Sequence, residues 1–422
     1  MLATNLVISL LGSSGGVAKA LLALLNHSCQ HASAPLHSLL QNSQIHLIDI
    51  RQKPLNHYRT RYPSLADKLA VHSFDLADTD RFKEHLLHTR TNLVIDVSWA
   101  DTVGMLECCN EFGISYINSA LENTWVDETE AVERFTLLER YRIVDEARDK
   151  YTNMKGILCS GMNPGVVQWM AIEMINRYPD ERPLACYIVE QDTSFYRDPS
   201  VIQANTVYSS WSPECFLDEA ILNYPVFMKW RSPFVIFREV YELEFKVTLG
   251  DKSFYGCLMP HEEVVTLGKL YDMEVGFLYR VSEYMTDIIR TNLDNVDDLW
   301  DWHHRVLDPE EAELLGEDLV GVLLVYEDKE RYMYNVLDNR SIFRKFGISA
   351  TYFQVACGLY AAASAAMLDS LSSGVHYVDE LLLASASRYG SYVSYYMKHF
   401  VTGENHSSDG LLSDRIKEIP TE

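Results

Sequence analysis

The chain has 422 residues, of which 60 are acidic and 36 are lysine or arginine, so its net charge is −24. Its length predicts two or three domains with large cores. The acidic excess argues against nucleic acids and anionic membrane surfaces as partners, because both would repel it, and it suits cationic partners.

Eight cysteines are scattered through the chain without a Cys-x-x-Cys pair, which argues against a zinc ribbon or a redox motif. They are typical of reduced core residues in a cytoplasmic protein. The opening MLATNLVISLLGSSGG lacks the basic region of a signal peptide, and no apolar run reaches the roughly 18 residues of a membrane span. His27 and His31 lie in a polar segment, so no metal site is predicted.

The N-terminal segment has the pattern strand, glycine turn, helix. Residues 5–11 are an apolar run of strand length, GSSGGVA follows at 12–18, and KALLALLN continues as a helix. Gly12 suits a sharp turn and Gly15 would let the backbone approach a pyrophosphate. This spacing is a variant of the dinucleotide-binding fingerprint. The predicted contacts in the turn are Gly12, Ser14, Gly15, Gly16 and Val17.

The second strand, IHLIDI at 45–50, ends near Asp49, whose carboxylate can accept the ribose hydroxyls of NAD. This acid favours NAD over NADP because it would repel a 2′-phosphate, although Arg51 offers such a phosphate a partner. Two later positions are predicted beside the cofactor: Asp75, near the end of a third strand at 70–78, and Ser98, in a fourth strand at 93–101.

Strands and helices continue to alternate through 114–120 and 155–160, which predicts an α/β fold with a Rossmann-type doubly wound parallel sheet. An α/β domain without a nucleotide is the alternative. We predict that residues 1–160 form this NAD-binding domain, completed by a helical segment at 348–400. Residues 161–347 are richer in β-branched and aromatic strands and predict a second, mixed α+β substrate domain. The polar tail at 402–422 is predicted to be disordered.

The stretch WSPECFLDE in the second domain combines an aromatic side chain with three acids. Ser212 and Pro213 begin a helix as N-cap and first residue, and Glu214 suits its first turn. Neither lysine nor arginine is close in sequence to Glu219. A small organic cation would fit the acids and Trp211, whereas the alternative is a solvated helix end beside a core tryptophan.

Five motifs in this order, GSSGGVA, GMNPGVV, VEQDT, WSPECFLDE and MPHEEVV, resemble the bacterial homospermidine synthases of the saccharopine dehydrogenase-like proteins. The similarity covers about residues 5–400. It implies a Rossmann domain with resident NAD, a substrate domain and a cytoplasmic homodimer. It also implies an aminobutyltransferase that joins two putrescine molecules and releases ammonia.

The resemblance assigns the substrate site to Glu122, Asn163, Glu190, Trp211, Glu219 and His261. It implies that Trp211 lies over the cationic amine or imine. Glu219 would hold the distal ammonium or transfer protons, and His261 would be a polar or acid–base residue. The chain departs from the family where Glu-Pro-Trp reads ENTW at 122–125, and where Trp99 and Ala100 precede the acid after the fourth strand.

Two other functions remain open. The first is a net NAD(P)-dependent oxidoreductase of the carboxynorspermidine or saccharopine dehydrogenase type. Such an enzyme should place an arginine or lysine near its carboxylate-bearing substrate, and segments 190–219 and 259–265 offer only Arg197. The second is a non-catalytic regulator that binds NAD and polyamines.

Overall fold

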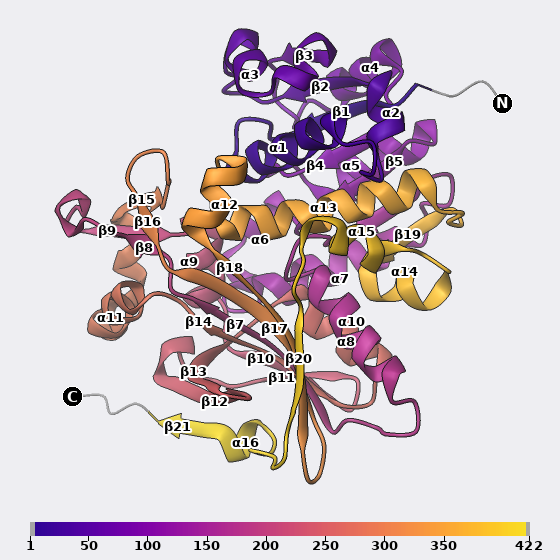
Figure 1. Ribbon diagram of the computed structural model, residues 1–422. Coiled ribbons are helices and arrows are strands. Elements are labelled where there is room, and N and C mark those ends of the chain that lie inside the picture. Colours follow the sequence, from indigo (N-terminus) through magenta and orange to yellow (C-terminus); the bar gives the residue numbers. More distant parts are fainter. Residues whose placement is uncertain (1–4, 419–422) are drawn as a thin grey trace. The chain divides into compact units, whose positions relative to one another are not determined.

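The computed structural model describes residues 5–418 (Figure 1). The chain divides into two compact units. Unit 1 comprises Met1–Glu128, Glu139–Val166 and Phe353–Met397, and unit 2 comprises Thr129–Leu138, Val167–Tyr352 and Lys398–Glu422.

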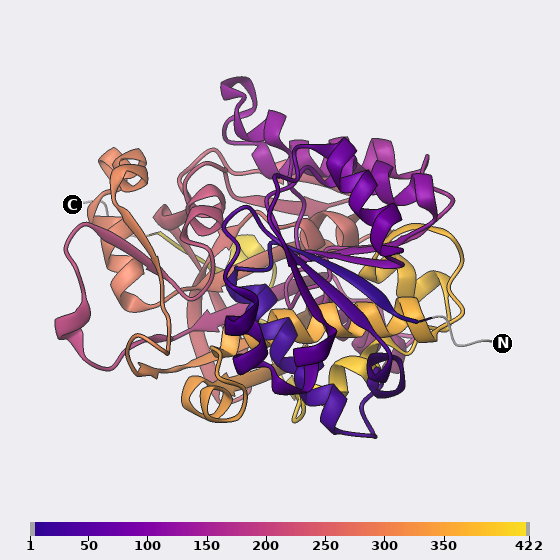
Figure 2. The same ribbon diagram turned by 90° about the horizontal axis from the view of Figure 1, so that it is seen from above.

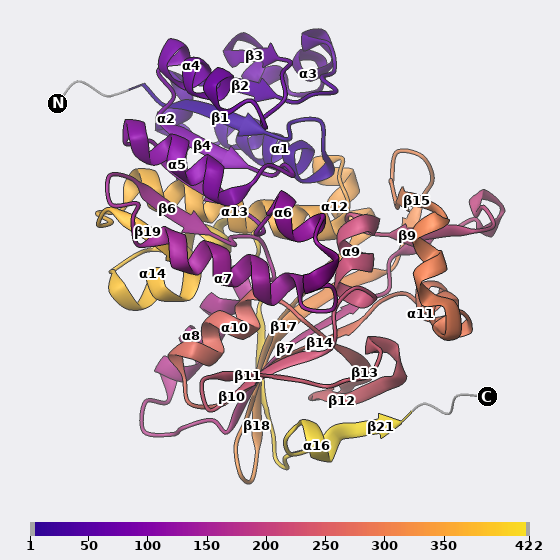
Figure 3. The same ribbon diagram turned by 180° about the vertical axis from the view of Figure 1, so that it is seen from behind.

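Unit 1 is built on a parallel sheet of seven strands. In spatial order these are β19 (Gly374–Tyr377), β6 (Lys155–Leu158), β5 (Ser115–Asn118), β4 (Leu93–Asp96), β1 (Val7–Leu11), β2 (Gln44–Ile48) and β3 (Leu69–His72). The labels β2, β1, β4, β6 and β19 follow this order down the view in Figure 3. Apart from β19, this is the Rossmann strand order. Strands β1 to β3 extend the sheet in one direction and β4 to β6 extend it in the other, so the order of addition reverses between β1 and β4. The predicted α/β fold class is confirmed.

Helices lie on both faces of this sheet (Figure 2). They include α1 (Gly16–Gln30), α2 (His37–Gln41), α3 (Leu55–Arg61), α4 (Thr79–Thr89), α5 (Thr102–Phe112), α6 (Thr124–Asp127), α7 (Thr136–Arg148), α14 (Val378–Ala384) and α15 (Tyr389–Tyr396). Strand β1 is buried at every position, as a strand covered on both faces must be. The predicted fourth strand ends early, at Asp96, because Ser98 donates its backbone and side-chain hydrogens back to the Asp96 carboxylate.

The helical segment predicted at 348–400 begins with the long helix α13 (Ala350–Leu368). Among the described residues it is the one helix long and apolar enough to cross a membrane, and 78% of its apolar window is buried. Its small residues permit a close contact, because a Cβ at Gly358 would lie 1.9 Å from the Gly161 oxygen. This contact, with a 3.0 Å hydrogen bond from Ser160 Oγ to the Gly358 carbonyl, anchors the loop after β6.

Unit 2 is built on a ten-stranded mixed sheet. Its main path runs β20 (Val401–Asn405), β18 (Glu330–Asp338), β17 (Glu317–Val325), β7 (Ala185–Asp192), β14 (Glu274–Arg280), β13 (Lys252–Met259), β12 (Leu243–Leu249) and β21 (Ile416–Glu418). Off this path, β10 (Val226–Lys229) pairs with β14, and β11 (Ser232–Val235) pairs with β10. Strands β14, β7 and β17 lie side by side in Figure 1. Strands β14 and β7 are parallel, whereas β17 is antiparallel to β7.

Shorter elements complete unit 2. Two small sheets pair β15 (His303–Val306) with β9 (Thr206–Ser209) and β16 (Leu314–Leu315) with β8 (Phe195–Tyr196). The helices are α8 (Val166–Arg177), α9 (Pro213–Ala220), α10 (Glu262–Leu270), α11 (Glu283–Thr291), α12 (Asn339–Phe346) and α16 (Leu412–Arg415). The core on one side of the sheet contains alternate residues of β7 (Ala185, Tyr187 and Val189), as the period of a strand requires.

The prediction of a disordered tail at 402–422 is wrong for the described residues. Strand β20 pairs with β18, β21 pairs with β12, and Leu412 of α16 is buried in the core of unit 2. The segment is polar, but its backbone finds partners on existing strands, which composition cannot reveal. Residues 419–422 lie outside the described residues.

Candidate functional site

The glycine turn follows β1 at the carboxyl edge of the sheet in unit 1. Gly12 has φ +71°, and a Cβ there would lie 2.5 Å from the Val97 oxygen, so only glycine fits without displacing the backbone after β4. Gly15 is the N-cap of α1 and provides no side-chain cap, and the first turn of α1 has no acid. The first turn therefore keeps backbone N–H groups and a positive dipole end that suit a phosphate.

Asp49 follows β2 and is tied to this turn. Its Oδ2 accepts a 2.9 Å hydrogen bond from the Ser14 backbone N–H, and its Oδ1 accepts one of 2.8 Å from Arg51 N–H. Ser14 Oγ donates to the Arg51 carbonyl at 3.0 Å. A carboxylate oxygen can accept more than one hydrogen, so Asp49 can still receive a ribose hydroxyl.

The other predicted cofactor residues lie after neighbouring strands of the same edge. Asp75 is exposed beyond β3, where it accepts from Ala77 N–H at 2.9 Å, and Ser98 follows β4. Sequence reasoning missed Asp96, the buried acid that positions Ser98. Burial raises the pKa of Asp96 to about 6, although hydrogen bonds from Ser98 and Tyr116 favour its carboxylate.

Two predicted substrate residues also lie in unit 1, after β5 and β6. The Glu122 backbone N–H donates a 3.0 Å hydrogen bond to Thr102 Oγ1, and its carbonyl accepts one of 3.0 Å from the Thr102 backbone N–H. Asn163 precedes Pro164 through a cis peptide bond, and the loop closes through a 2.7 Å hydrogen bond from Gly161 N–H to the Pro164 carbonyl. Both residues are partly exposed at the strand edge that carries the glycine turn.

The remaining predicted residues lie in unit 2. Ser212 caps α9 by accepting from Cys215 N–H at 3.2 Å, and Pro213 is the first residue of this helix, as predicted. Glu214 is an exposed first-turn acid, also as predicted, and lies 3.5 Å from His304 Nδ1. Arg197 forms a 2.9 Å ion pair with Glu313, and its side chain is 62% exposed.

Trp211 and Glu190 meet around Tyr279 of β14. Trp211 Nε1 donates a 3.3 Å hydrogen bond to the Tyr279 hydroxyl. Strand pairing places Tyr279 opposite Glu190 and Asp192 opposite Asp318, so the side chains of Glu190, Asp192 and Asp318 leave their strands on the same side as Tyr279. We call these five residues, Glu190, Asp192, Trp211, Tyr279 and Asp318, the tyrosine group.

Glu219 and His261 meet in a second group. His261 Nε2 lies 3.6 Å from Glu219 Oε1, and His261 Nδ1 is paired with Glu263 and lies 3.6 Å from Glu262 Oε2. His261, Glu262 and Glu263 are buried, and the Glu219 side chain is only 12% exposed. We call Glu219, His261, Glu262 and Glu263 the histidine group. Its last three residues offer ligand atoms within 4.8 Å of one another.

An aromatic pair joins the two groups. The rings of Phe277 and Tyr279, two residues apart on β14, stack with centroids 5.5 Å apart. The His261 ring lies 4.9 Å from the Phe277 ring, edge to face. The structure thus gathers the four predicted residues of unit 2 along one side of β14. The result is a largely buried face of the sheet with a carboxylate-rich group at each end of an aromatic pair, which we call the acidic surface.

Three carboxyl groups of this surface, those of Glu219, Asp192 and Asp318, are costly to ionise. Burial raises the pKa of Glu219 well above its usual value; His261 opposes the shift, whereas Glu262, Asp218 and Glu263 add to it. Burial raises the pKa of Asp192, and burial together with the charges of Asp192 and Glu190 raises that of Asp318. A cation bound here would stabilise the ionised forms.

His261 is the cation that the structure itself provides. Burial alone would lower its pKa, but Glu263 and Glu219 raise it well above the usual 6.5. Within the described residues, the buried atoms Glu219 Oε2 and Glu263 Oε1 have no hydrogen-bond partner. Buried polar atoms in native proteins are normally satisfied, so these two oxygens point to a further donor.

Sequence reasoning missed six residues of this surface: Asp192, Glu262, Glu263, Phe277, Tyr279 and Asp318. A signal existed for the first three, because they lie within the motifs VEQDT and MPHEEVV, and Asp192 has the strand parity of Glu190. Asp318 and Tyr279 are distant in sequence, and only strand pairing brings them to the site.

No protein-family model matches this chain, and no curated protein sequence matches it. Among solved structures, apo saccharopine dehydrogenase (L-Glu forming) from Saccharomyces cerevisiae aligns over 95% of this chain and 99% of its own, with a TM-score of 0.59 and 10% identity. The chain therefore has the fold of that dehydrogenase.

Smaller matches include UDP-glucose 4-epimerase from Bifidobacterium longum in complex with NAD⁺ and UDP. It aligns over 36% of this chain and 52% of its own, with 11% identity and a TM-score of 0.25. Another is dTDP-glucose 4,6-dehydratase from Bacillus anthracis in complex with NAD, which aligns over 43% of this chain and 64% of its own, with 11% identity and a TM-score of 0.25.

Proposed function

We propose that this protein is a homospermidine synthase-like aminobutyltransferase, which joins two putrescine molecules and releases ammonia. The observation that carries this proposal is the acidic surface, with its two carboxylate-rich groups joined by Phe277 and Tyr279. A diamine has the same pattern, because two ammonium ends are separated by an apolar methylene chain. Each end can meet a carboxylate group while the methylenes contact the rings.

We also propose that NAD binds unit 1 and serves this reaction. The uncapped first turn of α1 suits the pyrophosphate, the turn at Gly12 allows close approach, and Asp49 suits a ribose hydroxyl. Bound NAD would accept a hydride from the carbon beside one amine and later return it, so the overall reaction has no net redox change. Cytoplasmic location and a homodimer are part of this proposal, as the family resemblance implies.

Within the acidic surface, Glu219 is the residue that we assign to the substrate ammonium. Its buried Oε2 lacks a hydrogen-bond partner in the described residues, and an ammonium offers three hydrogens. Trp211 is fixed by its hydrogen bond to Tyr279 and offers its ring to a cationic amine or iminium, a contact worth about 2 kcal/mol when desolvated.

His261 would transfer protons in this scheme. Before substrate binds, Glu263 and Glu219 keep its imidazole protonated. An arriving ammonium shares these carboxylates and repels the imidazolium, so the pKa of His261 falls. His261 can then release the proton at Nε2, the nitrogen that faces Glu219, and accept one from an amine that must become a nucleophile. Glu122, Asn163 and Glu190 are proposed substrate contacts.

The test measures amine products from putrescine with sub-stoichiometric NAD and a chelator, the latter to exclude a metal-dependent activity. Homospermidine and ammonia should form in many-fold excess over NAD. Glu219→Gln should lower kcat/KM by about 100-fold or more, because a charge-assisted contact at the reacting substrate is lost. Glu214→Gln is the matched control on the same helix and should stay within about twofold of wild type, since Glu214 is exposed.

Normal turnover by Glu219→Gln would contradict the role of Glu219. Product limited to the NAD supplied would contradict the transferase and favour a net oxidoreductase, the second candidate. The observation in favour of that candidate is the fold shared with saccharopine dehydrogenase across almost the whole of both chains. Tight diamine binding without any product would instead identify a regulator.

A further inference from the structure

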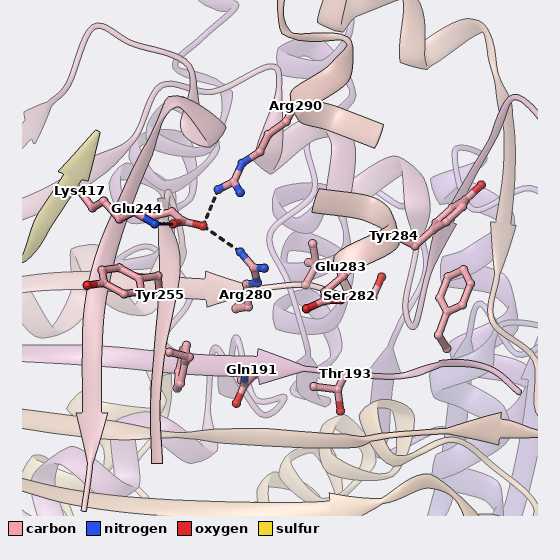
Figure 4. A pocket seen from close by; sticks show the side chains of 13 residues that line it. Gln191, Thr193, Glu244, Tyr255, Arg280, Ser282, Glu283, Tyr284, Arg290 and Lys417 are labelled. Atoms are coloured by element: carbon pink, nitrogen blue, oxygen red, sulfur yellow. Dashed lines mark hydrogen bonds and ion pairs between the residues drawn. The ribbon is translucent and has the colours of Figure 1, made fainter. Parts of the chain in front are cut away.

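A cavity in unit 2 has the opposite charge balance to the acidic surface. Its volume is about 670 Å³, within the range of small-molecule sites. Residues from β7, β8, β12, β13, β14, both ends of α11 and β21 line it (Figure 4). Gln191 and Arg280, which line it, are the strand neighbours of Glu190 and Tyr279 and leave β7 and β14 on the other side.

Three cations in this cavity share one carboxylate. Arg280 Nη1 and Arg290 Nη2 lie 2.8 and 2.5 Å from Glu244 Oε1, and Lys417 Nζ lies 3.5 Å from Oε2. Figure 4 shows the two guanidinium groups approaching Glu244 from one side and Lys417 from the other. Burial alone would raise the pKa of Glu244, but these cations lower it, so Glu244 is a carboxylate at neutral pH.

One glutamate cannot satisfy these cations. The cavity lining includes one more acid, Glu283, which is exposed, so three positive charges face two negative ones in a chain with a net charge of −24. In the described residues, Arg290 Nε is also buried without an oxygen or nitrogen hydrogen-bond partner, and the Cys257 thiol lies beside this side chain. A guanidinium has five N–H donors in a planar fork that suits carboxylate and phosphate oxygens.

Aromatic side chains provide flat apolar walls beside these charges. Phe195, Phe254, Tyr255 and Tyr284 line the cavity. The Lys417 ammonium lies 4.9 Å from the Tyr255 ring centre, which keeps this cation beside the ring. An anion that enters would therefore find charged donors near Glu244 and ring faces close by.

We propose that this cavity binds a small organic anion, with a carboxylate or phosphate held by Arg280, Arg290 and Lys417 and a flat apolar part against Tyr255 or Tyr284. Such a ligand differs in charge from the diamine proposed for the acidic surface. The two sites can be tested separately, because binding here needs neither NAD nor a diamine.

The experiment is calorimetric titration of the full chain, without NAD or diamine, with inorganic phosphate, phenyl phosphate and benzoate. Phenyl phosphate should bind about fivefold or more tightly than inorganic phosphate, because its ring stacks on the aromatic walls. Tighter binding of phenyl phosphate than of benzoate identifies a phosphate ligand, and the reverse identifies a carboxylate ligand. Either result supports the anion site.

Arg280→Gln should weaken binding of the tightest of these ligands about tenfold, as expected when a charged hydrogen-bond donor is lost. Lys417→Gln should weaken it about threefold, and it should fold normally because the Lys417 side chain is 56% exposed. Arg305→Gln is the charge-matched control, since Arg305 pairs with Glu311 and does not line the cavity.

Two results would overturn the proposal. One is the absence of binding by all three anions at about 10 mM, a concentration at which even a weak specific site fills. The other is equal affinity in wild type, Lys417→Gln and Arg305→Gln, which would assign any binding to the surface charge of the chain.

Discussion

The acidic surface and the cavity around Glu244 contain adjacent residues of β7 and β14 but have opposite charge balances. In the acidic surface, His261 is the cation among Glu219, Glu262 and Glu263. In the cavity, Arg280, Arg290 and Lys417 share Glu244. Burial raises the pKa of Tyr241, Arg280 and Arg290 oppose this rise, and Glu219 adds to it, so charges of both clusters act on this one hydroxyl.

The difference shows which charges stabilise the fold. Glu244 is ionised at no cost, since its pKa is lowered, and its removal would leave three cations without their common partner. Glu219 has a raised pKa, so its carboxylate costs stability. A costly buried acid is characteristic of functional sites, where a ligand provides the missing compensation.

The largest expected effect is a loss of stability in Glu244→Gln. This change should lower the free energy of unfolding by about 3 kcal/mol, because it leaves partly buried cations uncompensated. Urea denaturation followed by circular dichroism measures it. Glu242→Gln is the control, since Glu242 pairs with Arg238 four residues earlier in the chain and its loss should cost less than about 1 kcal/mol. Equal losses of unfolding free energy in Glu244→Gln and Glu242→Gln would show that Glu244 stabilises the fold no more than an ordinary surface ion pair does.

A smaller effect of opposite sign is expected in Glu219→Gln. At pH 8 the neutral amide avoids the cost of an ionised Glu219, so the free energy of unfolding should rise by about 1 kcal/mol. The same denaturation experiment measures it, with Glu214→Gln as the control. A stability gain together with the loss of turnover would separate function from folding at this residue. A loss of more than about 1 kcal/mol would show that Glu219 is structural.

The smallest effect is the pH dependence that separates the two clusters. Folded Glu244 has a lowered pKa, so its contribution is complete above the ordinary 4.5 and disappears as pH falls through the folded pKa. Folded His261 has a raised pKa, so its contribution is complete below 6.5 and disappears as pH rises through the folded pKa.

Wild type and Glu244→Gln should therefore become equally stable in acid, whereas wild type and His261→Gln should converge in alkali. Denaturation curves between about pH 2 and 10 give both differences. Convergence of both pairs on the same side of neutrality would refute the assignment of opposite charge states.

The Rossmann sheet could be predicted because its signals are local. The apolar run at 5–11, the turn at Gly12 and the acid at Asp49 each report a neighbouring piece of backbone. Asp96 escaped prediction because an aspartate within a strand pattern does not reveal whether Ser98 and Tyr116 will turn to it.

In unit 2 the sequence predicted members of the site but not their arrangement. Glu190, Trp211, Glu219 and His261 were identified from short motifs and a family resemblance, without any indication that Phe277 and Tyr279 join them. The cavity around Glu244 was not predicted at all, because its residues are far apart in the sequence. Arg280 follows Glu244 by 36 positions and Lys417 follows it by 173.

The sequence by itself determined the α/β class, the glycine turn and the helix that begins at Ser212, because propensity, capping and periodicity act over a few residues. Only the tertiary structure decided which charges meet. Strand pairing set Asp192 beside Asp318, and the tertiary fold set Glu219 of α9 beside His261, the N-cap residue of α10. Charge compensation depends on distances of a few ångströms between residues far apart in the chain, so it is a property of the folded protein.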